Sequence, residues 1–80
     1  MITRTELTQL ARTALKNDLV TFESNVDNTS DWDSLGQLSL LIVLDRATNG
    51  RSSELVELPA CTSLKQVFEI LKKNNLAEES

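Results

Sequence analysis

The apolar stretch in the middle of the chain constrains the fold more than any other feature of the sequence. Residues 34 to 48 read SLGQLSLLIVLDRAT. Four of the apolar side chains recur at helical spacing and form one stripe: Leu35, Leu38, Leu41 and Ile42. Three more widen this stripe: Leu40, Val43 and Leu44. A helix that is apolar on most sides is predicted to lie centrally, in contact with neighbours on several faces. A buried strand, LSLLIVL, is the alternative, but an N-cap at Asp33 or Ser34 and a stop at Asn49-Gly50 favour the helix.

An amphipathic helix is predicted over residues 3 to 17. Its apolar face consists of Leu7, Leu10, Ala11, Ala14 and Leu15. Thr3 and Glu6 fit a capping box, and Ile2 stands where a hydrophobic staple would join it to Leu7. Asn17-Asp18 is the predicted stop.

The last helix is predicted over residues 63 to 74. Its apolar face consists of Leu64, Val67, Phe68 and Leu71. Thr62 or Ser63 would cap it, and Ser63 with Gln66 fits a second capping box. Lys72 and Lys73 fall in its last turn, where the helix dipole favours cations.

The remaining segments are predicted to connect these helices. Residues 18 to 32 form a long acidic loop without Lys or Arg, and its apolar residues should pin it to the core: Leu19, Val20, Phe22, Val26 and Trp32. The indole of Trp32 is expected to fold onto the core with one edge exposed near Ser34, although Trp is also a common interface anchor. Residues 51 to 61 form a connector in which ELVEL at 54–58 is one helical turn ended by Pro59. Residues 77 to 80 are expected to be a frayed, polar tail.

These elements predict an all-α fold, a small three-to-four-helix bundle with a long loop between its first and second helices. A chain of 80 residues is one domain, with a core spanning about residues 3 to 74.

Composition excludes several functions. There is no His and only one Cys, so the commonest general base, the commonest metal ligand and an internal disulfide are all absent. The net charge of −4 argues against a nucleic-acid binder. No apolar run approaches the roughly 20 residues of a membrane span, and the N-terminus lacks a signal-peptide core. We therefore expect a soluble, cytoplasmic, monomeric protein that is not itself an enzyme.

One serine lies at the junction of the acidic loop and the apolar helix, in Asp31-Trp32-Asp33-Ser34-Leu35-Gly36. Its hydroxyl should be exposed because it begins the helix, and Gly36 should leave space around it. Unpaired N–H groups of the first turn would favour a phosphate attached there. Without a His, Ser34 cannot be the nucleophile of a Ser-His pair, so another protein must supply the base. The alternative is that Ser34 only caps the helix.

The motif and the layout resemble the acyl carrier protein family. The resemblance rests on Asp33-Ser34-Leu35, extended as Trp32-Asp33-Ser34-Leu35-Gly36, at the start of the second helix. It also covers the first helix, the long loop, the short third element and the Thr-Ser-Leu start of the last helix, or roughly residues 3 to 74.

The resemblance implies that Ser34 carries 4′-phosphopantetheine, which makes the chain a phosphoprotein. A phosphopantetheinyl transferase would move the group from coenzyme A with its own Mg²⁺, and the arm would then hold an acyl or aminoacyl group as a thioester. Asp33 would present the serine, and Leu35 would help dock partners or pack beside the arm. Those partners are loading and acyl-transferring enzymes, which the acidic loop would attract electrostatically.

The sequence departs from the family pattern in ways that indicate a specialised pathway. The second helix carries Asp45 and Arg46 but little other charge, whereas fatty-acid carriers have a strongly acidic one. Thr48-Asn49-Gly50-Arg51 replaces the usual aromatic-Gly-Ile pattern, and the Gly-Gly-x-Ser form of peptidyl carriers is absent. We therefore expect a carrier in a secondary-metabolite, lipid, polysaccharide or aminoacyl pathway rather than in fatty-acid synthesis.

The main alternative is a non-covalent helical adaptor that binds a basic partner through an acidic docking face. Cys61 is expected to be a small buried residue without a role. The acidic run from Asp18 to Asp33 lacks the regular ligand spacing of an EF-hand, so solvation and steering are favoured over Ca²⁺ binding.

Overall fold

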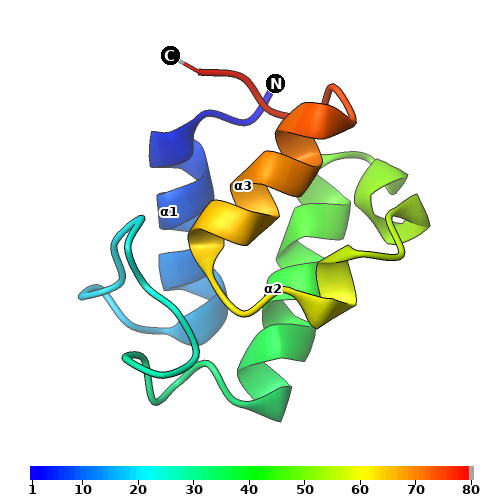
Figure 1. The fold of residues 1–80 in the computed structure, drawn as a ribbon. Helices are drawn as coiled ribbons and strands as arrows, with labels where there is room; N and C mark the ends of the chain where they lie inside the picture. Colours follow the sequence, from blue (N-terminus) through cyan, green and yellow to red (C-terminus); the bar gives the residue numbers. More distant parts are fainter. Residues whose placement is uncertain (80) are drawn as a thin grey trace.

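Three α-helices and two short 3₁₀ turns make up the computed structural model, which describes residues 1 to 79 (Figure 1). The elements in chain order are α1 (Arg4–Leu15), α2 (Ser34–Ala47), η1 (Arg51–Glu54), η2 (Leu58–Ala60) and α3 (Leu64–Lys73). Within residues 1 to 79 there is no β-strand, and only two isolated bridges occur, Ile2 with Ala77 and Asn25 with Ser63. The predicted all-helical bundle with a long α1–α2 connection is confirmed. No helix in this part of the chain is long and apolar enough to cross a membrane.

The start of α1 follows the predicted capping box. The Glu6 amide donates to Thr3 Oγ1, and the Thr3 amide donates to Glu6 Oε1, both at 3.2 Å. The helix ends at Leu15, because Lys16 adopts the left-handed conformation with φ 54°. This stop comes two residues before the predicted end at residue 17.

The start of α3 follows only half of its predicted capping box. Ser63 is the N-cap, and its hydroxyl accepts a hydrogen bond of 3.1 Å from the Gln66 amide. The Gln66 side-chain oxygen, Oε1, accepts instead from the Thr62 amide, at 2.7 Å. Ser63 therefore caps the helix. The Gln66 side chain, which was expected to accept from the Ser63 amide, accepts from the Thr62 amide instead.

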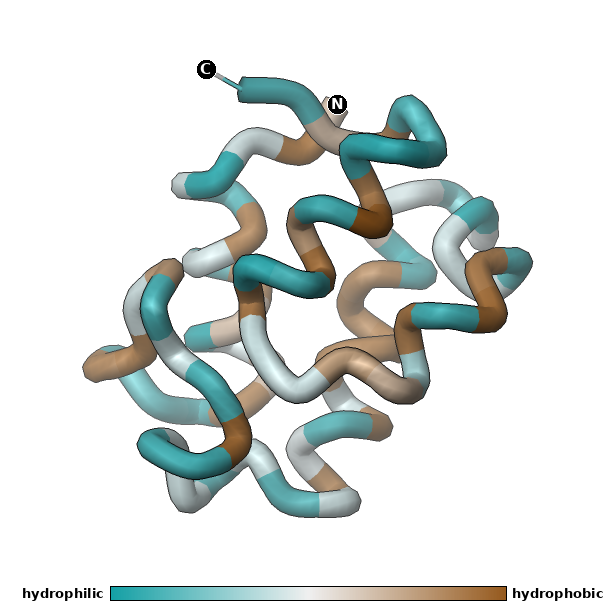
Figure 2. The backbone as a smooth tube through the Cα atoms, in the orientation of Figure 1, coloured by the Kyte–Doolittle hydropathy of each residue, from teal (hydrophilic) through white to brown (hydrophobic). Residues whose placement is uncertain are grey.

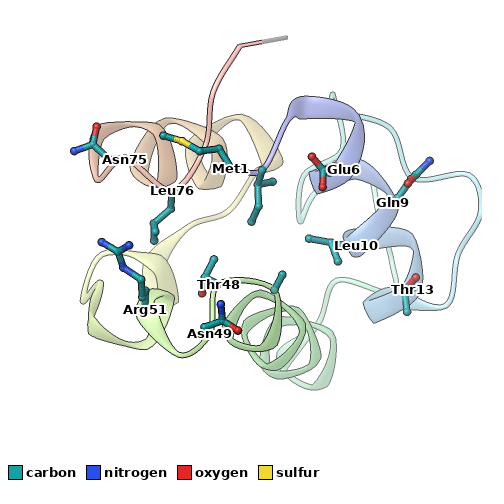
Figure 3. Close-up of a pocket in the computed structure, with 12 residues that line it drawn as sticks. Met1, Glu6, Gln9, Leu10, Thr13, Thr48, Asn49, Arg51, Asn75 and Leu76 are labelled. Carbon is teal, nitrogen blue, oxygen red and sulfur yellow. The ribbon is translucent and has the colours of Figure 1, made fainter.

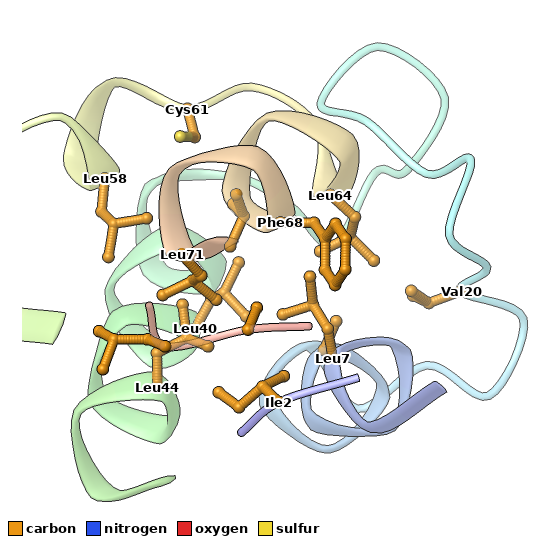
Figure 4. Packing of buried hydrophobic residues seen from close by; sticks show 14 of the residues in the cluster. Ile2, Leu7, Val20, Leu40, Leu44, Leu58, Cys61, Leu64, Phe68 and Leu71 are labelled. Carbon is orange, nitrogen blue, oxygen red and sulfur yellow. The ribbon is translucent and has the colours of Figure 1, made fainter. Parts of the chain in front are cut away.

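The core lies where the three helices meet, with α3 across α1 and α2 (Figure 4). Its fully buried large side chains come from every helix, the loop and η2: Leu7, Val20, Leu40, Leu44, Leu58, Leu64, Val67, Phe68 and Leu71. In Figure 2, brown and teal segments alternate along α3, whereas a continuous brown segment runs through the middle of α2. Ile2 is buried in the same cluster as Leu7, as the staple requires.

The predicted burial of α2 is partly wrong. Its buried residues are Gly36, Leu40 and Leu44, whereas Leu35, Leu38 and Ile42 of the predicted stripe are exposed. The cause is geometric. Helix α1 packs against one side of α2, η1 and η2 pack against another, and the outward side has no neighbour among residues 1 to 79. Only Leu41 of the stripe packs against the core, where it is partly buried.

The long loop is pinned to the core by fewer residues than predicted. Val20 and Trp32 are buried, and the Phe22 ring meets Phe68 edge-on at 5.5 Å between centroids. Leu19 and Val26 are exposed. Main-chain hydrogen bonds also fix the loop, because the Val26 amide donates to Thr62 O at 2.9 Å and the Leu64 amide to Ser24 O at 3.1 Å.

Two further predictions of local structure need correction. Residues 54 to 58 do not form one helical turn, since η1 ends at Glu54 and η2 begins at Leu58. Pro59 lies inside η2 rather than ending a turn, and this early helical position suits a residue without an N–H.

The tail is anchored over residues 77 to 79 rather than frayed. Ala77 is buried, and the Glu78 amide donates to Ile2 O at 3.0 Å. The Glu79 carboxylate pairs with Arg4 at 2.8 Å and with Lys72 at 3.3 Å. These contacts join the chain's two ends, a pairing that helical periodicity does not reveal. The last residue of the predicted tail, Ser80, lies outside the described residues.

Candidate functional site

Ser34 is the first residue of α2, at the point where the acidic loop ends. Its side chain is exposed, and its hydroxyl makes no hydrogen bond to any of residues 1 to 79. The N-cap is Asp33, whose Oδ1 accepts a hydrogen bond of 2.9 Å from the Gly36 amide. The interpretation of Ser34 as the helix cap is therefore wrong. Asp33 caps the helix, and the neighbouring Ser34 hydroxyl has no hydrogen-bond partner among residues 1 to 79.

A hydrogen-bonded chain holds the residues on both sides of Ser34. Trp32 Nε1 donates to Gln37 Oε1 at 2.6 Å, and Gln37 Nε2 donates to the Pro59 carbonyl at 3.1 Å. The network thus ties the end of the loop and the first turn of α2 to η2. Because the indole is only 4% exposed, the expectation that one edge is open to solvent is wrong. Sequence reasoning missed Gln37, whose role depends on a contact 22 residues away.

Gly36 permits the close approach of α1 to the first turn of α2. A Cβ at this position would collide with the carbonyl oxygen of Asp31 and would lie 2.8 Å from Leu15 Cδ2. The predicted space around Gly36 is therefore filled by the chain itself. This approach places the end of α1, with Lys16, beside the turn that presents Ser34.

An apolar strip runs along the outward side of α2 directly after Ser34. It consists of Leu35, Leu38 and Ile42, whose exposed fractions are 74%, 55% and 44%. Residues at these spacings lie on one helix face. Isolated exposed leucines are ordinary, but three along one face form a contiguous surface. Leu35 thus stands where a partner or an attached group can reach it.

A groove of about 380 Å³ lies between the end of α1 and this strip, and we call it the α1–α2 groove. Its apolar lining comes from both helices: Ala14, Leu15, Leu35, Leu38 and Ile42. Lys16, Asp31 and Asp33 supply its charges. The two sequence neighbours of Ser34, Asp33 and Leu35, both line it. The groove therefore opens beside the candidate attachment site.

The loop that leads to Ser34 is acidic, although Arg12 Nε donates to its Val20 carbonyl at 2.8 Å and Lys65 pairs with its Glu23 at 2.6 Å. Residues 17 to 33 contain no Lys or Arg, and their exposed carboxylates are those of Asp18, Glu23, Asp27, Asp31 and Asp33. Asp31 Oδ2 accepts a hydrogen bond of 2.9 Å from Asn17 Nδ2. Lys16 forms no ion pair with any of residues 1 to 79. Among these residues no cluster of His, Cys, Asp or Glu could hold a metal ion.

A larger groove, of about 540 Å³, lies at the other end of the molecule (Figure 3). Met1, Leu10 and Leu76 contribute to its apolar lining, with Glu6 and Arg51 on opposite sides. It meets α2 at Ala47, and the 14 residues of that helix span about 20 Å. This groove is therefore remote from Ser34.

Cys61 is buried, as expected of a small apolar residue. Burial raises the pKa of its thiol above the ordinary value, and the nearby Glu57 carboxylate raises it further. A thiol with a raised pKa is mostly protonated at neutral pH and is a poor nucleophile. Because Cys61 is buried and Ser34 is exposed, Ser34 is the more accessible of the two for covalent modification.

Comparisons with protein-family models, with curated proteins and with solved structures found no match for this chain.

Proposed function

We propose that the chain is a carrier protein that bears 4′-phosphopantetheine on Ser34 and belongs with the acyl-carrier-protein-like bundles. The observation that carries this proposal is the division of roles between two adjacent residues. Asp33 caps α2 and thereby fixes the turn, whereas the Ser34 hydroxyl is exposed and has no partner among residues 1 to 79. A reactive group presented at a rigid position is what a covalent carrier requires.

The residues around Ser34 suit a phosphodiester. The amides of Ser34 and Leu35 have no intrahelical acceptor, because the first N–H groups of a helix never do. They would face an attached phosphate at the positive end of the α2 dipole. The Gly36 amide is already engaged by Asp33, and that carboxylate opposes a second negative charge. Lys16, across the groove, offsets this repulsion.

Attachment would use an enzyme's catalytic groups and this chain's oxygen. The Ser34 Oγ forms a bond to phosphorus, the pyrophosphate bond of coenzyme A breaks, and the nucleotide half leaves. The transferase supplies Mg²⁺ and the base that takes the hydroxyl proton, since no His is present here. Once attached, the group supplies a thiol that holds an acyl or aminoacyl unit as a thioester. The chain itself catalyses no step in this scheme.

Partner enzymes would dock beside Ser34. The apolar strip on α2 supplies contact area, and the exposed carboxylates of residues 17 to 33 attract basic surfaces. Because α2 carries only Asp45 and Arg46, its own charge contributes little to recognition. This weakly charged helix supports a specialised pathway rather than fatty-acid synthesis.

The decisive test is intact-protein mass spectrometry. The purified chain is incubated with coenzyme A, Mg²⁺ and a promiscuous phosphopantetheinyl transferase. We expect a gain of one phosphopantetheinyl mass that maps to Ser34 and disappears in Ser34→Ala. Ser30→Ala is the matched control, because Ser30 is also an exposed serine in the acidic part of the chain, and it should load normally. Folded protein that gains no mass with several transferases contradicts the proposal.

The apolar strip also favours a second candidate function, a non-covalent adaptor. Exposed Leu35, Leu38 and Ile42 could seat a partner without any prosthetic group, with the acidic loop providing attraction. An adaptor would bind its partner equally well after Ser34→Ala and would gain no mass with coenzyme A. Loading at Ser34 would favour the carrier.

A further inference from the structure

We infer that the groove of about 540 Å³ at the far end of the molecule, which we call the remote groove, binds a dipeptide with free ends and apolar side chains (Figure 3). The inference goes beyond the proposed function and does not depend on it, because the remote groove meets α2 at the opposite end from Ser34. The lining offers a partner for each part of such a ligand: its two charged ends, its peptide bond and its side chains.

Two opposite charges stand on opposite sides of the remote groove. Glu6 belongs to the first turn of α1 and Arg51 to η1 (Figure 3). The Arg51 guanidinium forms no ion pair with any of residues 1 to 79. Glu6 Oε1 accepts from the Thr3 amide at 3.2 Å, and its second carboxylate oxygen has no partner in this part of the chain. Because Glu6 would repel an anion and Arg51 a cation, the pair favours a ligand that carries one charge of each sign.

The size of the groove sets the distance between the two charges of the ligand. A groove of about 540 Å³ is about 8 Å across, and two residues of extended chain span about 7 Å. A single α-amino acid carries both charges on one carbon, so it cannot reach both sides at once. A dipeptide is therefore the shortest chain whose ammonium can meet Glu6 while its carboxylate meets Arg51.

Two carboxamides line the groove just beyond the ends of α2 and α3. They belong to Asn49 and Asn75, whose backbones are left-handed, with φ 55° and 62°. This conformation is common for Asn at the end of a helix. Neither side chain hydrogen-bonds to any of residues 1 to 79. A carboxamide both donates and accepts, so these two side chains suit the N–H and the carbonyl of a peptide bond.

The remaining lining is largely apolar and is continuous with the core. Ile2 and Leu76 are buried core residues, and Leu10 packs against the core. Met1 is 63% exposed beside them, so its flexible side chain is available to cover a ligand. Covering this surface removes it from water, which favours aliphatic side chains on the dipeptide.

The first experiment titrates the unmodified, ¹⁵N-labelled chain with the dipeptide leucyl-leucine. Backbone amide shifts should change saturably at Leu10, Asn49, Arg51 and Asn75, with a dissociation constant at or below about 1 mM. Glycyl-glycine should bind at least about tenfold more weakly, because it leaves the apolar lining in water. Shifts that do not saturate below about 10 mM leucyl-leucine, or that fall outside the groove, would overturn the inference.

Two variants test whether the groove reads the two charges. Glu6→Gln keeps an oxygen for the Thr3 amide but removes the charge, and it should weaken leucyl-leucine binding by about three- to tenfold. N-acetyl-leucyl-leucine has no ammonium, so Glu6→Gln should not change its affinity. Arg51→Gln should weaken leucyl-leucine binding by a similar factor and leave that of leucyl-leucine amide, which has no carboxylate, unchanged. Arg46→Gln, an exposed change on α2 outside the lining, is the control and should bind like the wild type.

The same titration separates this inference from the proposed function. Ser34→Ala should bind leucyl-leucine like the wild type, since Ser34 is remote from the groove. Ala47→Trp fills the groove at an exposed position and should abolish binding, which keeps the test decisive if Glu6→Gln or Arg51→Gln does not fold. Binding that survives Ala47→Trp would overturn the inference. So would a dipeptide capped at both ends that binds as tightly as leucyl-leucine, because the two charges would then play no part.

Discussion

Helices α2 and α3 differ in how they use apolar residues. Helix α3 is the more polar of the two, yet it buries Leu64, Val67, Phe68 and Leu71 and keeps its charged residues outside. Helix α2 is the more apolar, yet its buried residues are only Gly36, Leu40 and Leu44. The polar residues of α3 must face solvent, so this helix can pack against the core in only one orientation. Helix α2 has more apolar surface than its neighbours cover. The surplus on α2 is the strip beside Ser34.

The comparison shows that the number of side chains a helix buries depends on how many elements pack against it, and not on how apolar the helix is. A bundle of this size has one small core, and each helix contributes one stripe to it. Apolar residues beyond that stripe remain at the surface and are available for binding. We therefore expect substitutions in α3 to affect stability and substitutions on the outward side of α2 to affect function.

Phe68→Ala should have the largest effect on stability. The Phe68 ring is fully buried, meets Phe22 edge-on, and lies under the Arg4 guanidinium at 5.5 Å. Removing a buried aromatic ring typically lowers the free energy of unfolding by about 3–5 kcal/mol. Urea denaturation followed by circular dichroism measures the loss. A loss below about 1 kcal/mol, the range of surface changes, would mean that α3 is not the main contributor to the core.

Gly36→Ala should have the next largest effect, because the Asp31 carbonyl and the Leu15 side chain leave no room for a Cβ at this position. The new methyl group would collide with the Asp31 carbonyl, which belongs to the backbone and cannot rotate away. Overpacking of this kind costs about 1–3 kcal/mol, more than the helix propensity of Ala returns. Thermal denaturation measures the change. Gly50→Ala is a poor control because Gly50 has φ 85°, a backbone conformation that is strained for Ala. Ser39→Ala, which lies on α2 like Gly36, is the control instead. An unchanged melting temperature would contradict the close approach.

Asp33→Ala and Ser34→Ala should separate two adjacent residues. Loss of the Asp33 cap should lower the free energy of unfolding by about 1 kcal/mol, the usual value for an N-cap. Ser34→Ala should change it by less than about 0.5 kcal/mol, since its hydroxyl bonds to none of residues 1 to 79. Loading should show the opposite pattern, abolished by Ser34→Ala and only reduced by Asp33→Ala. Equal losses of stability would mean that Ser34 shares the cap.

Leu38→Ser tests the outward strip of α2. Because Leu38 is 55% exposed, we expect a change in stability within about 0.5 kcal/mol. The rate of loading by the transferase should fall, because partner contacts at the strip are lost. Leu71→Ser on α3 is the counterpart, and it should lower the stability of the chain strongly because Leu71 is fully buried. A Leu38→Ser variant that loads at the wild-type rate would place docking elsewhere.

Local signals in the sequence predicted much of the fold. The capping box at Thr3 and Glu6, the Ser63 cap and the amphipathic face of α3 depend on residues three or four positions apart, and periodicity reports them. The exposed strip of α2 was not predicted, because a helix apolar on most sides does not indicate which side lacks a neighbour. The Trp32–Gln37–Pro59 network and the Ile2–Ala77 pairing join distant parts of the chain, and no local pattern encodes them.

For the candidate site, the sequence identified Ser34, Asp33 and Leu35 but not their division of roles. Aspartate and serine are about equally good N-caps, so sequence alone left the cap open between them. Their backbone positions decide it, since Asp33 is extended and Ser34 is already helical. The α1–α2 groove could not be predicted from the sequence either, because it depends on how α1 packs beside the first turn of α2 at Gly36.

The smallest effect concerns the polar side of α3, where Glu79 of the tail contacts Lys72 and Arg4. The Arg4 hydrogen bond lowers the pKa of the Glu79 carboxyl below its ordinary value. Desolvation opposes this shift in part, and the hydrogen bond from Lys72 lowers the pKa further. A carboxylate whose pKa is lower in the folded state stabilises that state at pH values above its ordinary pKa. The stabilisation disappears as the pH falls through the lowered value. We therefore expect the Glu78 amide, bonded to Ile2, to lose protection from hydrogen exchange on acidification while the amide of Phe68 keeps its own. Glu79→Gln should remove this pH dependence, and Glu54→Gln, an exposed change on η1 outside the contact, should retain it. Equal loss of protection at Glu78 and Phe68 would mean that acid unfolds the whole bundle, and that the tail contact is no weaker than the core beneath it.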